Sequence, residues 1–107
     1  MATDVVEIAS YEYYQYSSKE DDKAYILCEG VGGHLINLQF KGGTLPLPQA
    51  VKAGRGNPGE NTYILFFRYS DMSNVIDMLR NEKPVYLKFD SGAVQNTRIS
   101  TSSAVIS

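Results

Sequence analysis

The sequence predicts a small, β-rich α+β domain, and three observations favour this fold. The 107-residue chain is 43% apolar and 21% charged, which is close to the average of globular domains. It contains eight Tyr and four Phe, and aromatic side chains favour strands. Its one clear helical pattern, near residues 71–82, lies between two strand patterns. We therefore expect residues 1–107 to form a single globular domain.

The expected architecture is about six mostly antiparallel strands in the order β-β-β-loop-β-α-β-β. Short connections favour antiparallel neighbours, so a small barrel or curled sheet follows, with the helix closing one end or face. The connection from residue 69 to residue 85 is long enough to allow a parallel crossover instead. A split α/β layer is the alternative architecture.

The N-terminal half contains three strand patterns. Residues 5–16 read as extended, with Ala9 and Ser10 marking a bulge or a break between two short strands. Residues 24–29 and 34–41 are the second and third strands, and the glycine-rich turn between them predicts a hairpin. In the third strand, apolar residues alternate with polar ones, and we expect Ile36, Leu38 and Phe40 to face the core.

The longest irregular region spans residues 42–61, and we expect a single helical turn at residues 49–53 within it. In residues 62–69, the side chains that point to either face of a strand are mostly apolar until Arg68. This pattern predicts a central strand that is covered on both faces. Ser70 is the expected N-cap of the following helix. The apolar stripe of that helix consists of Met72, Val75, Ile76 and Leu79.

Pro84 ends the helix, because the residue before a proline disfavours helical geometry. Residues 85–90 then form a strand, and residues 94–101 form the last one. In the first of these two strands the alternation places Val85, Leu87 and Phe89 inward, and Tyr86 and Lys88 outward.

Charge and cysteine content restrict the class of protein. The formal net charge is −2 and the basic residues are scattered, which argues against a general binder of nucleic acid or anionic membrane. Cys28 is the only cysteine, so no internal disulfide forms, which suits a reducing compartment. Residues 1–10 lack the features of a signal peptide, and no apolar run is long enough to span a membrane. We expect a cytoplasmic protein.

The sequence contains no legible catalytic constellation. Residues 54–59 match Gly-x-Gly-x-x-Gly, but a proline-rich loop precedes them and a strand follows, so a flexible loop is the better interpretation. His34 lacks obvious partners for a metal site or a catalytic dyad, and Cys28 lies in an apolar strand without an adjacent base. We therefore expect no enzymatic activity, cofactor or metal. An enzyme using His34 and acids near the long loop is the least favoured hypothesis.

The tyrosines of residues 11–16 are the most unusual local feature, because a regular strand must turn about half of them away from the core. Exposed tyrosines favour a protein interface, so we expect a non-catalytic interaction module that self-associates or binds a protein partner. The alternative is a small β-barrel that binds single-stranded nucleic acid by base stacking. The candidate interaction surface comprises Tyr11, Tyr13, Tyr14, Tyr16, Arg55, Arg68, Tyr86 and Lys88.

Overall fold

The structure, a computed structural model, describes residues 3–17, 22–43, 46–54 and 59–101. Within these ranges the strands are β1 (Thr3–Gln15), β2 (Asp22–Gly30), β3 (Leu35–Lys41), β4 (Val51–Gly54), β5 (Asn61–Arg68), β6 (Tyr86–Asp90) and β7 (Arg98–Ser100). The helix α1 (Met72–Asn81) follows a 3-10 turn, η1 (Tyr69–Asp71), and a second 3-10 turn, η2 (Val94–Asn96), precedes β7. The predicted β-rich α+β fold with one helix is confirmed.

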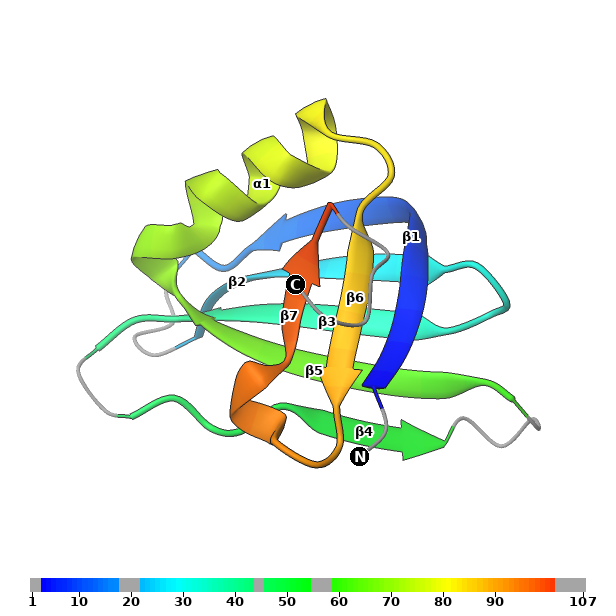
Figure 1. The fold of residues 1–107 in the computed structure, drawn as a ribbon. Helices are drawn as coiled ribbons and strands as arrows, with labels where there is room; N and C mark the ends of the chain where they lie inside the picture. The colour runs from blue at the N-terminus through cyan, green and yellow to red at the C-terminus, as the bar shows by residue number, and fades with distance from the viewer. Residues whose placement is uncertain (1–2, 18–21, 44–45, 55–58, 102–107) are drawn as a thin grey trace.

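The strands form one curled sheet in the order β4-β5-β3-β2-β1-β6-β7. All neighbouring pairs are antiparallel except β3 and β5, which are parallel. Figure 1 shows β6 and β7 in front of β3 and β5, with α1 across one end of this half-barrel. The rings of Tyr63 in β5 and Phe89 in β6 lie 5.5 Å apart, so strands that are distant in the sheet order meet across the core.

The core follows from the alternation of apolar residues. Ile36, Leu38 and Phe40 of β3 are all fully buried, as predicted from their spacing. The inward residues predicted for β6 are confirmed by the burial of Leu87 and Phe89. In α1 the predicted stripe also faces the core, with Val75 and Leu79 buried and Met72 and Ile76 partly buried. No helix in the described part of the chain is long and apolar enough to cross a membrane.

Strand β1 bends so that it belongs to both halves of the curled sheet. The register with β2 shifts between Ile8 and Ser10, which confirms the bulge predicted at Ala9 and Ser10. The bend brings β1 onto the end of β2, where a Cβ added to Gly30 would lie 2.4 Å from Cγ1 of Val6. A residue without a side chain is therefore required at this crossing.

Three local predictions for the chain after β3 are wrong. The helical turn expected at residues 49–53 does not form, because residues 51–53 belong to β4, which pairs antiparallel with β5. The last strand begins at Arg98, because residues 94–96 form η2. Ser70 is not an N-cap, because it lies inside η1, and α1 begins at Met72 without a side-chain cap.

Strand β5 is not covered on both faces, although its apolar sequence predicts a central, doubly buried strand. Tyr63 and Leu65 are buried in the core, whereas Ile64 and Phe66 on the opposite face are partly exposed. The reason is its position next to the edge strand β4, in a sheet whose outer face no helix covers (Figure 1). The apolar outer side of β5 is therefore accessible at the surface.

We predict that Gly30→Ala destabilises the fold by about 1–3 kcal/mol, because the new methyl group overlaps Val6. The measurement is the free energy of unfolding from urea denaturation. Gly54→Ala is the matched control, because a Cβ at Gly54 meets nothing within 4 Å, and it should change stability by about 0.5 kcal/mol or less. Equal effects of the two substitutions would contradict the close packing at Gly30.

Candidate functional site

The tyrosines of the second half of β1 divide between the two faces of the sheet. Tyr11 and Tyr13 lie opposite Cys28 and Ile26, which are core residues, so these two tyrosines share the inner face. Tyr14 lies opposite Tyr25 and therefore faces outward. Tyr13, Tyr14 and Tyr16 are 43%, 41% and 38% exposed, which is high for large aromatic side chains.

On the outer face three tyrosines are in contact. The rings of Tyr14 and Tyr25 are stacked, with centroids 4.7 Å apart and an interplanar angle of 13°. Tyr16 extends this cluster, since its ring lies 5.8 Å from that of Tyr25 at an angle of 44°. We refer to these three residues and their neighbour Leu27 as the tyrosine surface.

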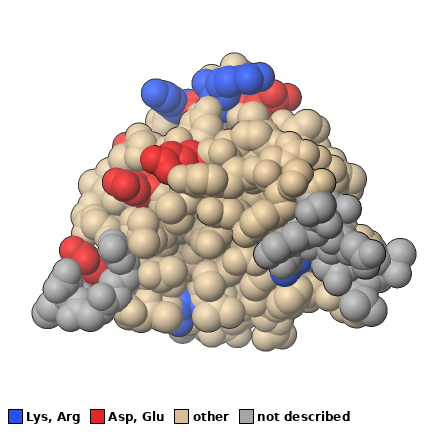
Figure 2. Space-filling model, turned by 180° about the vertical axis from the view of Figure 1, so that it is seen from behind, with Lys and Arg blue, Asp and Glu red and all other residues tan. Residues whose placement is uncertain are grey.

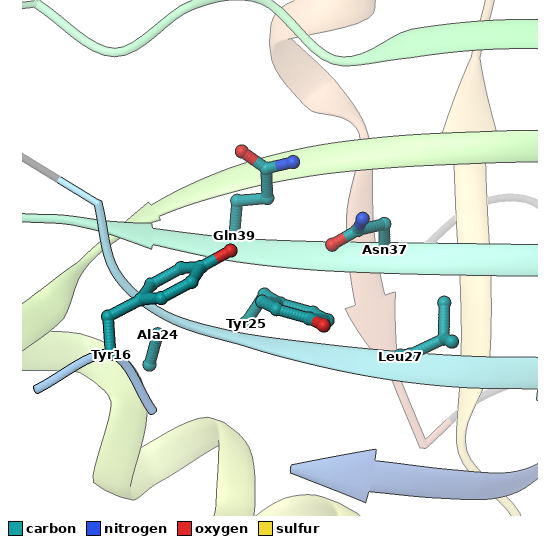
Figure 3. Close-up of a pocket in the computed structure, with 6 residues that line it drawn as sticks. All are labelled: Tyr16, Ala24, Tyr25, Leu27, Asn37 and Gln39. Carbon is teal, nitrogen blue, oxygen red and sulfur yellow. The ribbon is translucent and has the colours of Figure 1, made fainter. Parts of the chain in front are cut away.

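A hollow of about 340 Å³ lies beside the tyrosine surface, lined by Tyr16, Ala24, Tyr25, Leu27, Asn37 and Gln39. Figure 3 shows the ring of Tyr16 reaching over β2 toward Gln39, while the ring of Tyr25 forms the floor between β2 and β3. Aromatic and aliphatic carbon thus alternates with amide groups. Such a mixture suits contact with a protein surface that has both apolar and hydrogen-bonding groups.

The outer face continues beyond the tyrosine surface onto β5 and β4. Ile64 lies beside Asn37 of β3 and Val51 of β4, and Phe66 lies beside Gln39. Figure 2, which views the molecule from this side, shows that uncharged residues occupy most of the face and that the charged ones gather mainly toward its margins. The tyrosine surface is therefore part of a broad, mostly uncharged sheet face.

Of the basic residues predicted as part of the interaction surface, the structure describes Lys88 and Arg68, which lie in different parts of the sheet. Lys88 is fully buried, so the expectation that it is exposed is wrong. It lies in β6 between Val5 of β1 and Arg98 of β7, and burial together with the charge of Arg98 lowers its pKa. Tyr86 shares the face of Lys88 but is only partly exposed. Neither residue is a neighbour of the tyrosine surface, because β6 pairs with residues 3–7 of β1, whereas the tyrosine surface lies at residues 14 and 16 and on β2.

Arg68 lies on the outer face of β5 beside Lys41, but its Nη1 atom is buried and has no hydrogen-bond partner among the described residues. Arg55 falls outside the described residues. Of the eight predicted site residues, the structure thus brings together Tyr14 and Tyr16. The structure adds Tyr25 to this pair. The sequence pattern did not single out Tyr25, because it does not show which residue of β1 lies opposite Tyr25 in β2.

A second polar cluster, absent from the sequence-based prediction, joins β1, β4 and β5. The phenol of Tyr63 donates a hydrogen bond of 2.8 Å to Oδ2 of Asp4, and the same carboxylate oxygen lies 2.5 Å from Nζ of Lys52. The side chain of Asn61 donates to the Tyr63 oxygen at 3.4 Å, and its backbone N–H donates to Nδ1 of His34 at 3.2 Å. We refer to these five residues as the closing cluster.

The electrostatics of the closing cluster favour a structural role. Burial and the hydrogen bond to Asp4 raise the pKa of Tyr63 to about 12, so its phenol stays protonated. Burial opposes the charged form of Asp4, but the hydrogen bonds and charge supplied by Lys52 and Tyr63 outweigh it and lower the pKa of Asp4. Tyr63 is only 1% exposed, which leaves no room for a substrate at its hydroxyl.

Cys28 and His34, the other side chains considered for chemistry, also have structural roles. Burial raises the pKa of Cys28 to about 12, so its thiol is not a nucleophile at neutral pH. In the described ranges, no group of three or more His, Cys, Asp or Glu side chains could hold a metal ion. His34 accepts a hydrogen bond from the backbone that leads into β5, which fixes the β2–β3 turn against that strand.

Comparison with known proteins gives no match. No family model matches the chain, and no curated protein or solved structure is significantly similar to it.

We predict that Tyr63→Phe lowers the free energy of unfolding by about 1.5–3 kcal/mol, because it removes a hydrogen bond to a charged carboxylate. The measurement is urea denaturation at neutral pH. Tyr13→Phe is the matched control, since the hydroxyl of Tyr13 is exposed and bonds to the nearby, exposed Gln15, and its effect should stay below about 0.5 kcal/mol. An equal loss in both variants would contradict a special role of Tyr63.

The lowered pKa of Asp4 predicts acid-sensitive stability. The unfolded chain binds this proton more readily than the folded one, because only the folded chain holds the carboxylate beside Lys52 and Tyr63. The contribution of Asp4 is therefore fully present above the ordinary pKa of an aspartate and is lost as the pH falls through the lower pKa of the folded state.

Asp4→Asn should accordingly be less stable than the wild type at neutral pH, and the difference should narrow as the pH falls into the acid range. The measurement is the free energy of unfolding as a function of pH. Asp77→Asn, at an exposed ion pair on α1, should show no such convergence.

Proposed function

We propose that this chain is a non-catalytic interaction module that binds a protein partner through the tyrosine surface. The single observation that carries the proposal is the contact of Tyr14, Tyr16 and Tyr25 on an open, mostly uncharged sheet face. Tyrosine is enriched at protein interfaces because it brings a large contact area together with a polar hydroxyl and few rotatable bonds. Stacking in advance of binding further reduces the ordering that a partner must impose.

The composition of the outer face supports the proposal. A solvent-facing side of an antiparallel sheet is usually polar, whereas here Leu27, Ile64, Phe66 and Val51 accompany the tyrosines. Five strands about 4.8 Å apart and about 17 Å long give a face of roughly 400 Å² in projection. Large exposed apolar side chains that gather on one face mark interaction sites on soluble proteins.

The charge of the outer face favours an uncharged protein surface as the partner. By strand register, Lys41 and Arg68 lie on this face at one end, and Glu12 and Glu29 lie on it along β1 and β2. The two signs balance, so the face lacks the positive field that attracts a polyanion. A partner with apolar side chains and a few hydrogen-bonding groups complements it better than single-stranded nucleic acid does.

A display library of random peptides tests the proposal directly, with selection on the wild-type protein and monovalent affinity measurements on the enriched peptides. Tyr14→Lys should weaken binding tenfold or more, because it removes one member of the stacked pair and adds a charge. Val31→Lys is the control, since it adds the same charge at an exposed apolar residue in the turn after β2, outside the tyrosine surface.

Enriched peptides that bind Tyr14→Lys as well as the wild type would overturn the proposal. Equal weakening by Val31→Lys, or a library that yields no binders, would do the same. Titration with a mixed-sequence oligonucleotide at low salt tests the alternative. Binding that falls steeply with added salt would replace the protein partner with a nucleic acid.

A further inference from the structure

Strand β1 has a second feature besides its tyrosines, which is an edge that no strand in the described part of the chain occupies. Residues 3–7 pair with β6, and residues 8–15 pair with β2 on the other side. The backbone N–H of Ile8 donates a hydrogen bond of 2.8 Å to the carbonyl of Val85, just before β6. Around Pro84 the chain leads away to α1, so among the described strands residues 10–15 have a neighbour on one side only.

The register shows which backbone groups point to this free edge. The backbone N–H of Gly30 donates to the carbonyl of His34, so Gly30 and every second residue before it point their backbone groups toward β3. The intervening residues of β2 therefore face β1, where they pair with Ser10, Glu12 and Tyr14. By alternation, the backbone N–H and C=O groups of the remaining residues point away from β2. These are Tyr11, Tyr13 and Gln15.

The first part of the free edge lies along a groove whose opposite wall is the end of α1 and the segment that follows it. A groove of about 810 Å³ begins where β6 leaves β1, and it is lined by residues 7–11 of β1 and by the segment from Leu79 to Val85. Further along the edge, Glu12, Tyr13 and Gln15 are exposed. Among the described residues, no backbone hydrogen bond outside the pairing with β2 involves residues 11, 13 or 15. Unpaired, exposed edges of this kind are the template for adding a strand from another chain.

We infer that the free edge pairs with the same edge of a second copy of this chain, in an antiparallel dimer whose twofold axis passes beside Tyr13. The pairing would join the two curled sheets into one continuous sheet. It does not depend on the proposed function, because it needs only the backbone groups of this edge and no other protein. A twofold contact of this kind is closed, which limits the assembly to two copies.

The sequence of the edge selects the register. With Tyr13 opposite Tyr13 of the second copy, Tyr11 lies opposite Gln15 and all outward-pointing backbone groups find partners. In this register Glu12 lies opposite Tyr14 of the second copy, so no like charges meet. If Tyr11 instead lies opposite Tyr13 of the second copy, Glu12 meets Glu12, and the two like charges repel. If Tyr13 instead lies opposite Gln15, the partner of Tyr11 falls beyond the end of β1.

The same register links the edge to the outer face. Glu12 and Tyr14 both point outward, so their apposition across the axis places the two tyrosine surfaces side by side. The charge of Glu12 is already engaged, because its carboxylate accepts a hydrogen bond from the hydroxyl of Tyr14 in the same chain. The dimer would therefore present one aromatic surface of twice the size.

Disulfide trapping tests the register in the full-length protein. Paired residues of this type have Cα atoms about 5.5 Å apart, within the range that a disulfide bridges. Tyr13→Cys should therefore form a covalent dimer under oxidised glutathione at least tenfold faster than Gln15→Cys, which lies on the same edge but opposite Tyr11 of the second copy. The native Cys28 does not interfere, because it is buried and its pKa is raised to about 12.

Val31→Cys, in an exposed turn, measures the rate of random collision. Rates for Tyr13→Cys that match those of Val31→Cys or Gln15→Cys would overturn the inference, since either result removes the specific apposition at Tyr13. Failure here would leave the tyrosine surface untouched, because its test depends on Tyr14.

Light scattering over a range of concentrations provides an independent check that needs no cysteine. The wild type should show the mass of a dimer, and Tyr13→Lys should raise the dissociation constant at least tenfold, because two Lys side chains then meet across the axis. A wild type that stays monomeric at all concentrations would overturn the inference. A dimer that Tyr13→Lys leaves intact would do the same, because it would then form through another surface.

Discussion

The architecture depends on side chains, and not on backbone hydrogen bonds, to close the curled sheet. The strand order places β4 and β5 at one end and β6 and β7 at the other, and these ends do not pair. Tyr63 joins them, with its ring against Phe89 and its hydroxyl bonded to Asp4. Lys52 adds the edge strand β4 to the same carboxylate. The buried phenol of Tyr63 and the ammonium of Lys52 both bind the charged carboxylate of Asp4. Hydrogen bonds to a charged group are stronger than those between neutral groups, so this contact holds the two ends of the sheet together.

This mode of closure determines what happens to β1. Its first half must lie close enough to β5 for Asp4 to reach Tyr63, while its second half continues the hairpin with β2. The bulge after Ile8 allows β1 to change direction between these two pairings. The bend brings Val6 of β1 against Gly30 of β2, where only a glycine leaves enough room. Because β6 is only five residues long and β1 is thirteen, the end of β1 is left with a free edge. Natural edges are commonly protected by Lys, Pro or a covering element, whereas this one carries tyrosines.

The parts of the fold that the sequence predicted correctly are those with local signals. The strict alternation of β3 placed Ile36, Leu38 and Phe40 in the core, and the spacing of Val75 and Leu79 defined the inner side of α1. Both signals come from neighbours within one element, where geometry alone relates residue number to direction. Strand β4 lacked such a signal, because its four residues are exposed and only pairing with β5 makes them a strand.

The features that escaped prediction depend on pairing between segments far apart in the chain. Lys88 has the alternation of an outward residue, yet it is fully buried, and no signal within β6 marks which outward residues the rest of the protein covers. The bond from Tyr63 to Asp4 joins residues 59 positions apart, and no local pattern marks either of them. The tyrosine surface likewise combines a local signal with a non-local one. Alternation along β1 places Tyr13 and Tyr14 on opposite faces, but only the register with β2 places Tyr25 beside Tyr14. A cluster of tyrosines in one strand becomes a binding surface only when a neighbouring strand adds its own aromatic ring to the same face.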